Sequence, residues 1–330
     1  MPPLSILDLA PVVEGATTRE ALLNSLDLVK LADELGYTRY WVAEHHNMEG
    51  VASSATAVLI GQLAAASQRI RVGAGGIMLP NHAPLTIAEQ FGTLAELFPG
   101  RIDLGLGRAP GTDRPTMRAL RRSLETAGED SFPNDVLELQ SYLAPAKDEA
   151  QVRAVPGQGT EVPIWLLGSS LYSAQLSAYL GLPFAFASHF APEMLMQALQ
   201  VYRSTYKPSA SHAKPHAMVG LNVVVAPTDE EAQFLFTSAQ QRFLGMVRGR
   251  RGKLPPPVAS MDGLWAPAEA MQVERMLSES IVGSPETVRA GLAASAERTG
   301  ADEFIVACAV HDHAARRCSY ELLSGLASLG

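Results

Sequence analysis

Short apolar segments alternate with longer amphipathic segments along most of the chain. The short segments have the length of buried strands, whereas the longer ones repeat apolar residues at helical spacing, as Leu22, Leu26 and Val29 do. The pattern predicts eight strands, at residues 4–10, 40–43, 70–80, 102–106, 164–167, 184–188, 221–226 and 304–310. We therefore predict an α/β protein with a (β/α)8 TIM barrel. A doubly wound open sheet is the alternative, because periodicity alone does not show that the sheet closes.

Several helix boundaries can be predicted from capping residues. Ser284, Pro285 and Glu286 are typical of a helix start, and Gly181 follows the last turn of another predicted helix. A capping box of Thr86 and Glu89 predicts the start of a helix that runs to residue 98. Further helices are predicted at residues 54–66, 132–144 and 312–329.

Two stretches fit neither period well. They are residues 109–160 and 245–275, which we predict to be long insertions after the fourth and seventh strands. The basic run at 248–253 is expected to form a solvated loop, with a lid over the barrel mouth as the alternative. No internal repeat or linker divides the chain, so residues 1–330 are predicted to form a single domain.

Composition limits the class of protein. Hydrophobic residues make up 47% and charged residues 18%, which allows a large core. The formal net charge of -8 argues against binding of nucleic acid, which requires a basic face. We expect no secretory signal and no membrane span. The two cysteines, Cys308 and Cys318, do not indicate a disulfide framework, so a cytoplasmic location is expected.

The third predicted strand ends in glycines. It reads I-R-V-G-A-G-G-I-M-L-P, so Gly73, Gly75 and Gly76 remove the side chains where the strand finishes. Glycine inside a strand usually serves a bulge, a bend or the close approach of a ligand. We interpret Gly75–Gly76 as a flat surface on which a ligand lies.

Polar residues cluster at the ends of the predicted strands, which is where function is found in a parallel barrel. They are Glu44, His45 and His46 after the second strand, Arg108 after the fourth, Ser169 and Ser170 after the fifth, His189 after the sixth, and His311 and His313 after the eighth. The serines and Arg108 suit an anion such as phosphate, although an ordinary helix cap and a rim salt bridge are the alternative. Of the adjacent His45 and His46, only one is expected to face a ligand.

A metal site is a competing hypothesis. His311 and His313 could join His45, His46 and His189 in a barrel hydrolase. No acid is obviously placed to complete such a set, so we predict that the protein has no metal site.

Six segments carry a resemblance to a known family. They are W-V-A-E-H-H, V-G-A-G-G-I-M-L-P-N-H, A-E-Q-F-G-T-L-A-E-L-F-P-G-R-I, G-L-G-R-A-P-G, L-L-G-S-S and G-L-P-F-A-F-A-S-H-F. In this order they resemble the bacterial luciferase-like flavin monooxygenase family, over nearly the whole chain. The resemblance implies a barrel that binds FMN, reduced by a separate NAD(P)H-dependent flavin reductase. The reduced flavin and O2 would oxygenate a small organic substrate, and the protein would be a homodimer.

The resemblance also implies roles for individual residues. The catalytic position falls on His45, with Glu44 beside it, and a cis peptide that supports the flavin falls on Gly75–Gly76. Phosphate-binding positions fall on Arg108, Gly168, Ser169, Ser170 and Ser173. Substrate-side positions fall on His46, His82, Gln90 and His189.

The resemblance leaves the reaction open. The light-emitting members have an acid where this chain has Ser169, and other members use a deazaflavin. A flavin-binding protein without catalysis is therefore the first alternative function. A metal-dependent hydrolase is the second.

Overall fold

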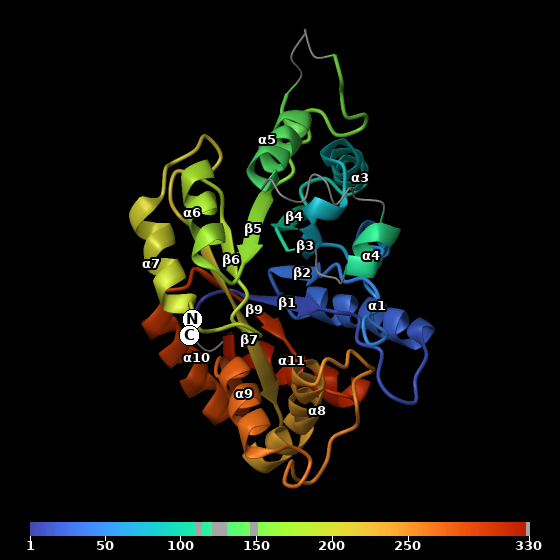
Figure 1. Cartoon of the computed structure of the whole chain (residues 1–330), viewed down its shortest axis with the longest axis vertical. Coiled ribbons are helices and arrows are strands. Elements are labelled where there is room, and N and C mark those ends of the chain that lie inside the picture. Colours follow the sequence, from blue (N-terminus) through green and yellow to red (C-terminus); the bar gives the residue numbers. More distant parts are fainter. Residues whose placement is uncertain (110–113, 121–130, 146–150, 328–330) are drawn as a thin grey trace.

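Nine parallel strands form one sheet, and eight of them close into a barrel (Figure 1). The computed structural model describes residues 1–109, 114–120, 131–145 and 151–327. The barrel strands are β1 (Leu4–Asp8), β2 (Arg39–Val42), β3 (Arg71–Met78), β4 (Ile102–Gly107), β5 (Ile164–Gly168), β6 (Phe184–Phe186), β7 (Ala217–Val225) and β9 (Glu303–Ala307). The ring closes because β7 pairs with both β6 and β9, and β9 pairs with β1. The TIM barrel is confirmed and the open sheet is wrong.

Helices surround the barrel (Figure 1). They are α1 (Thr18–Glu34), α2 (Thr56–Ala66), α3 (Pro84–Leu97), α4 (Arg114–Ala119), α5 (Phe132–Leu143), α6 (Leu171–Leu180), α7 (Leu195–Thr205), α8 (Asp229–Val247), α9 (Pro267–Met276), α10 (Pro285–Thr299) and α11 (His313–Ala327), with a 3-10 turn, η1, at Leu79–Asn81. No described helix combines the length and the apolar character that crossing a membrane requires. The end of the predicted last helix, residues 328 and 329, lies outside the described residues, as do parts of the 109–160 insertion.

Two capping predictions are confirmed and one is wrong. The Ser284 side chain accepts the N–H of Thr287 at the start of α10, and Gly181 ends α6 in the left-handed conformation, with φ 63°. The predicted capping box of Thr86 and Glu89 does not form, because α3 already begins at Pro84. Proline needs no N–H partner at a first helical position, so it can start the helix there.

The strand β8 (Ser280–Gly283) was not predicted. It pairs with the second half of β7, from Asn222 to Val225, beyond the part of β7 that pairs with β6. β7 itself begins at Ala217 rather than at residue 221, and all nine of its residues are buried. The chain between β7 and α10 therefore contains a strand as well as the helices α8 and α9, and it extends beyond the predicted insertion at both ends.

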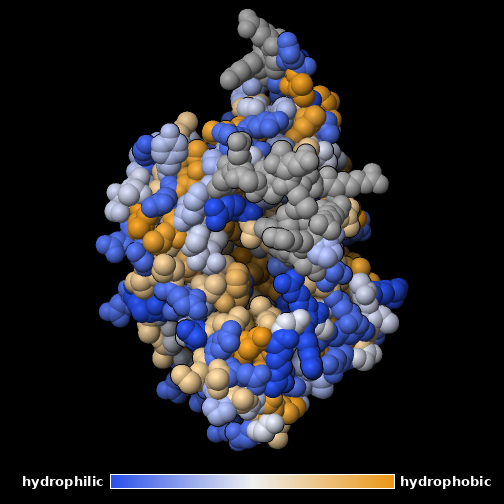
Figure 2. Space-filling model, in the orientation of Figure 1, coloured by the Kyte–Doolittle hydropathy of each residue, from blue (hydrophilic) through white to orange (hydrophobic). Residues whose placement is uncertain are grey.

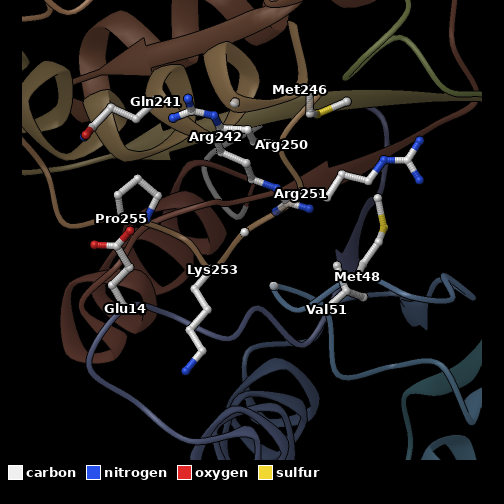
Figure 3. A pocket seen from close by; sticks show the side chains of 13 residues that line it. Glu14, Met48, Val51, Gln241, Arg242, Met246, Arg250, Arg251, Lys253 and Pro255 are labelled. Atoms are coloured by element: carbon white, nitrogen blue, oxygen red, sulfur yellow. The ribbon is translucent and has the colours of Figure 1, made fainter. Parts of the chain in front are cut away.

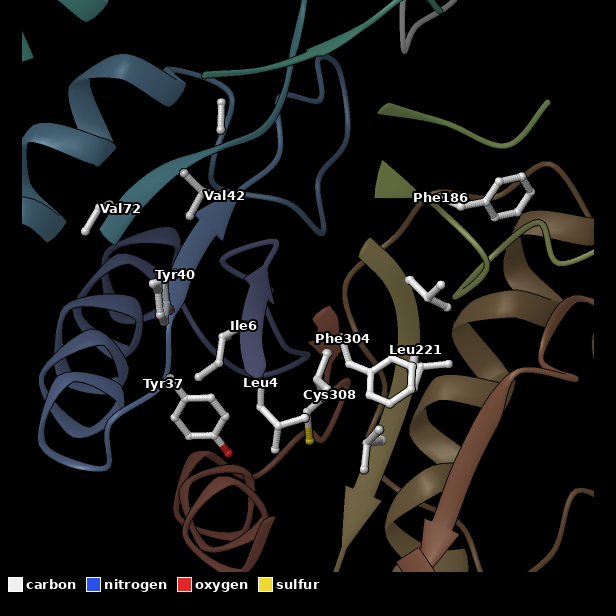
Figure 4. Close-up of a cluster of buried hydrophobic side chains, with 14 of the residues drawn as sticks. Leu4, Ile6, Tyr37, Tyr40, Val42, Val72, Phe186, Leu221, Phe304 and Cys308 are labelled. Atoms are coloured by element: carbon white, nitrogen blue, oxygen red, sulfur yellow. The ribbon is translucent and has the colours of Figure 1, made fainter. Parts of the chain in front are cut away.

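The core has two parts. A large cluster fills the space between strands and helices, and Figure 4 shows Ile6, Tyr40 and Phe304 within it. A smaller cluster takes the alternate strand residues, because successive side chains point to opposite faces of a strand. Its buried members are Leu7, Trp41, Ala43, Trp165, Ala185, Met218 and Ile305. The barrel interior is thus packed by large side chains.

Buried ion pairs close the N-terminal end of the barrel. Arg39 Nη1 lies 2.7 Å from Asp103 Oδ2, and its Nε lies 3.0 Å from Glu303 Oε1. Asp103 also accepts the indole N–H of Trp41 at 3.2 Å. Arg39, Asp103 and Glu303 stand at the starts of their strands, so ion pairs close this end of the barrel. The polar residues that follow the strands lie at the other end.

Candidate active site

Glu44 lies two residues after the end of β2 and is the centre of a hydrogen-bond network at the C-terminal end of the barrel. Its side chain is 1% exposed. Its Oε2 accepts the N–H of Met78 at 3.0 Å, and its own N–H donates to the carbonyl of Gly76 at 3.1 Å. Its Oε1 lies 2.7 Å from Nε2 of His46 and 2.9 Å from Nε2 of His82. Burial favours the neutral acid, but the contacts with His82, His46 and Met78 outweigh it and lower the pKa of Glu44.

The Gly75–Gly76 peptide is cis, as predicted. The pairing of β3 with β4 shifts register between Ala74 and Ile77, which makes the glycine pair a bulge. A Cβ on Gly76 would lie 2.7 Å from the carbonyl oxygen of Gly105. The close approach that requires a glycine at position 76 is therefore made by the backbone of the neighbouring strand β4, whereas we had assigned it to a ligand.

His45 and His189 have a different environment from His46. The Nδ1 atoms of both rings are buried and have no hydrogen-bond partner among the described residues. Burial, followed by the positive charge of Arg242, lowers the pKa of His45 to about 4. The same two causes, with His45 third, lower the pKa of His189 to about 4. Both rings are therefore neutral at pH 7, and each has a buried nitrogen available to a ligand.

Residues from β4 and β5 meet at the first turn of α6. The guanidinium carbon of Arg108 lies 4.0 Å from the centre of the Tyr172 ring. Ser170 is the N-cap of α6 and makes no side-chain capping bond, while its Oγ lies 3.4 Å from Oγ of Ser173. A Cβ on Gly168 would lie 2.1 Å from Oγ of Ser173, so the glycine lets the serine lie close to the strand. The structure thus brings together the residues predicted to bind an anion.

The basic run packs against the barrel mouth, so the expectation of a solvated loop is wrong for part of it. Leu254 is 1% exposed and exchanges backbone hydrogen bonds with the β1–α1 loop, through Val12 O at 2.9 Å and Glu14 N at 2.8 Å. Lys253 Nζ donates to the carbonyl of Ala16 at 3.0 Å. A Cβ on Gly50 would lie 2.2 Å from the carbonyl oxygen of Gly252, so the β2–α2 loop supports the same segment.

A pocket of about 220 Å³ lies beneath this docked segment (Figure 3). Its walls come from the β1 and β2 loops, the end of α8 and the segment 250–255. Figure 2 shows a recess in the middle of the molecule, apolar in its depth and bordered by hydrophilic side chains. The mouth of the barrel therefore offers apolar surface beside fixed charge.

Some predicted site residues do not contact the candidate residues at the C-terminal end of the barrel. Gln90 is exposed on α3, and no contact joins it to the other candidates within the described part of the chain. His311 Nε2 lies 3.1 Å from the carbonyl of Glu14, and His313 Nε2 lies 2.9 Å from Asp27. The metal set that combined these two histidines with His45 and His189 is not assembled.

One other set has the composition of a metal site. Glu44, His46 and His82 place their possible ligand atoms within 4.8 Å of one another, the one such group among the described residues. This group shares only His46 with the histidine set considered from the sequence, and the fold places Glu44 between His46 and His82. Both rings already lie within hydrogen-bond distance of the carboxylate, which accounts for the arrangement without a metal.

The sequence did not lead us to Arg242, whose positive charge lowers the pKa of both neutral histidines. It lies on α8, a helix that we did not predict. The signal was present: Thr228 caps the helix by accepting the N–H of Glu231. Phe236 and Phe243 then place apolar residues on the buried face at helical spacing.

Three comparisons agree on the family. A family model described as luciferase-like monooxygenase matches residues 4–303. A luciferase-like monooxygenase of Escherichia coli strain K12 is 57% identical over 318 residues, which are 96% of this chain and 95% of that protein. N-acetyl-S-alkylcysteine monooxygenase of Bacillus subtilis strain 168 is 32% identical over 330 residues, 97% of each chain. The crystal structure of apo-MsnO8 superposes with a TM-score of 0.93 at 36% identity and covers 100% of this chain and 99% of that one.

Both the barrel and the sequence matches extend over essentially the whole chain, and the strand-end motifs lie together at one mouth. The protein belongs to the luciferase-like monooxygenase family and is an oxidoreductase.

Proposed function

We propose that this protein is an FMN-dependent monooxygenase that uses reduced flavin and O2 to oxygenate a small organic substrate. One observation carries the proposal. The neutral His45 and the serine turn beside Arg108 both follow barrel strands, so they lie at the same mouth of the barrel. Reduced flavin, when bound, supplies the electrons that activate O2. A separate NAD(P)H-dependent reductase would supply that flavin, in keeping with the family resemblance, and a homodimer is proposed on the same ground.

Arg108, Ser169, Ser170 and Ser173 are the proposed phosphate ligands. Ser170 does not cap α6 with its side chain, and the first turn of a helix is a favourable place for an anion. A guanidinium can add a bidentate contact to the same phosphate. Gly75 and Gly76 are proposed to face the flavin ring at the end of β3.

His45 is the proposed catalytic residue. Because its ring is neutral at pH 7, it can accept a proton from the reacting substrate or hold a hydrogen bond to it. Its buried Nδ1 is without a partner in the described chain, which supports contact with a bound molecule. His189, with the same pKa and its own unpaired Nδ1, is proposed on the substrate side.

Glu44 is proposed to position this site rather than to react. Its described hydrogen bonds are all with neighbouring protein groups, namely those of Met78, Gly76, Asn81, His46 and His82. They fix the segment that precedes His45 against the end of β3. His46 and His82 belong to the same network, so we propose that they shape the substrate side through Glu44.

The experiment combines the protein with FMN, NADH, a flavin reductase and labelled O2, and presents N-acetyl-S-alkylcysteines, the substrate type named in the Bacillus relative. Incorporation of one labelled oxygen atom into the product supports the proposal. His45→Ala should abolish incorporation while FMN still binds. Reoxidation of flavin without any labelled product, equal in the wild type and His45→Ala, would support the non-catalytic flavin carrier instead.

A further inference from the structure

The pocket under segment 250–255 is strongly basic in an acidic protein. Four of its lining residues are cations, Arg242, Arg250, Arg251 and Lys253, and one, Glu14, is acidic. The chain as a whole carries a formal charge of -8. The positive charge of the pocket is therefore a local feature and does not follow from composition. It lies in a concave site, where low-dielectric walls strengthen the field.

Arg242 lines this pocket from α8. It is half-buried, yet the described chain gives its guanidinium neither a hydrogen bond nor an acidic partner. Burial, followed by the charge of Arg316, lowers the pKa of Arg242. Arg316 is different, because its Nη2 forms an ion pair with Asp8 at 2.7 Å. A partly buried cation without a partner is costly, and an anion placed beside it would offset that cost.

The other walls indicate what kind of anion fits. Met48, Val51, Met246 and Pro255 line the same pocket and offer apolar contacts next to the guanidinium groups (Figure 3). An inorganic anion has no apolar surface that could pack against these side chains. An organic acid, with one charged end and an apolar body, matches both parts of the lining.

Two cations that line the pocket also affect the proposed catalytic residue. The charges of Arg242 and Arg251 both act on His45, and that of Arg242 acts on His189. His45 lies in the same β2–α2 loop as Met48 and Val51, which line the pocket, so this loop joins the basic pocket to the proposed catalytic residue. The proposed phosphate ligands Arg108 and Ser170 belong to β4 and α6, on elements that do not line this pocket.

We propose that this pocket binds the carboxylate of the substrate through Arg242, so that the enzyme is selective for small organic acids. The identity of the bound molecule as the substrate rests on the proposed monooxygenase function. Arg251 and the docked segment 250–255 complete the site from above. Specificity for the substrate then comes from one charge-assisted contact and an apolar wall. The group of the substrate that is to be oxygenated is held toward His45.

The test measures binding by calorimetry, without flavin and again with oxidised FMN. The probes are N-acetyl-S-benzylcysteine and its methylamide, in which an uncharged group replaces the carboxylate. The wild type should bind the acid about tenfold or more tightly than the amide. Arg242→Gln should bind both equally, and Arg242→Lys should regain part of the preference. Arg275→Gln removes the same charge from an exposed position on α9, and should keep the full preference.

Circular dichroism and thermal unfolding establish that each variant folds. If Arg242→Gln does not fold, Arg251→Gln takes its place and should reduce the preference for the acid. Equal binding of acid and amide by the wild type, or an undiminished preference in the folded arginine variants, overturns the proposal. So does a loss of FMN affinity in Arg242→Gln that Arg108→Gln does not share, because the pocket would then bind the flavin phosphate. Because binding is measured without turnover, the test of the anion pocket remains valid even if the protein proves not to be a monooxygenase.

Discussion

The backbone N–H of Glu44 donates to the carbonyl of Gly76 at 3.1 Å, and this bond ties the end of β2 to the end of β3. The Glu44 carboxylate adds a second tie through Met78, 3.0 Å away, and holds the two rings of His46 and His82. A single buried carboxylate thus fixes the loop that carries His45.

Glu44→Gln should destabilise the protein by about 2–4 kcal/mol, because an amide cannot accept all of these hydrogen bonds and leaves buried donors unpaired. Urea unfolding measures the effect. Glu49→Gln, in the same loop but exposed, should change the free energy of unfolding by less than about 0.5 kcal/mol. Equal effects of the two substitutions would show that the Glu44 network does not hold the loop.

Stability should fall as the pH is lowered from about 6.5 to about 4. The pKa of His45 and of His189 is about 4 in the folded protein against an ordinary 6.5, so the unfolded chain binds more protons in this window. Each histidine then contributes about 3 kcal/mol that is present above pH 6.5 and lost by pH 4.

Urea unfolding at pH 7.5, 6, 5 and 4.5 measures this loss. The lowered pKa of Glu44 acts at more acidic pH, below its ordinary 4.5, and does not produce a loss near pH 6. His189→Asn should flatten the pH dependence. A wild type whose free energy of unfolding is the same at pH 7.5 and pH 5 would rule out two buried neutral histidines.

Arg242→Gln should raise the pKa of both His45 and His189. The arginine charge disfavours the protonated rings, so its removal moves each pKa upward toward the ordinary value. Burial remains, so the pKa should stay below 6.5. Titration of the ring signals by NMR measures the change, with Arg275→Gln as the charge-matched control. No change in Arg242→Gln would mean that its guanidinium does not face these rings.

The barrel could be predicted because its signal is local. Each strand is a short apolar segment, and the ends of parallel strands must meet at one face. β8 escaped prediction because Ser280, Ile281 and Val282 are only partly buried, and the strand exists as a partner for the overhang of β7. Its apolar signal is correspondingly weak.

The site could be predicted only where strand order determines it. Arg108 and Ser170 follow neighbouring strands, so their meeting at α6 follows from the fold. The ion pairs of Arg39 join residues far apart in the chain, Asp103 and Glu303, and no local pattern reports such a contact. The same holds for Glu44 and His82, whose contact depends on the path of the chain after β3.

The purified protein should contain no stoichiometric metal. Glu44 already holds hydrogen bonds with His46 and His82, so treatment with EDTA should leave both the unfolding temperature and any oxygenation unchanged. Elemental analysis before and after chelation measures this. One equivalent of zinc or iron, lost from His82→Ala, would instead make the cluster a metal centre.

The most direct test of the proposed function is anaerobic titration with reduced FMN, followed by flavin fluorescence or calorimetry. The account predicts that one equivalent binds, that riboflavin binds more weakly for lack of the phosphate, and that Arg108→Gln removes this difference. Reduced deazaflavin F420 should not bind more tightly than FMN. If the wild type binds FMN no better than riboflavin, or binds only the deazaflavin, the proposed FMN-dependent function is contradicted.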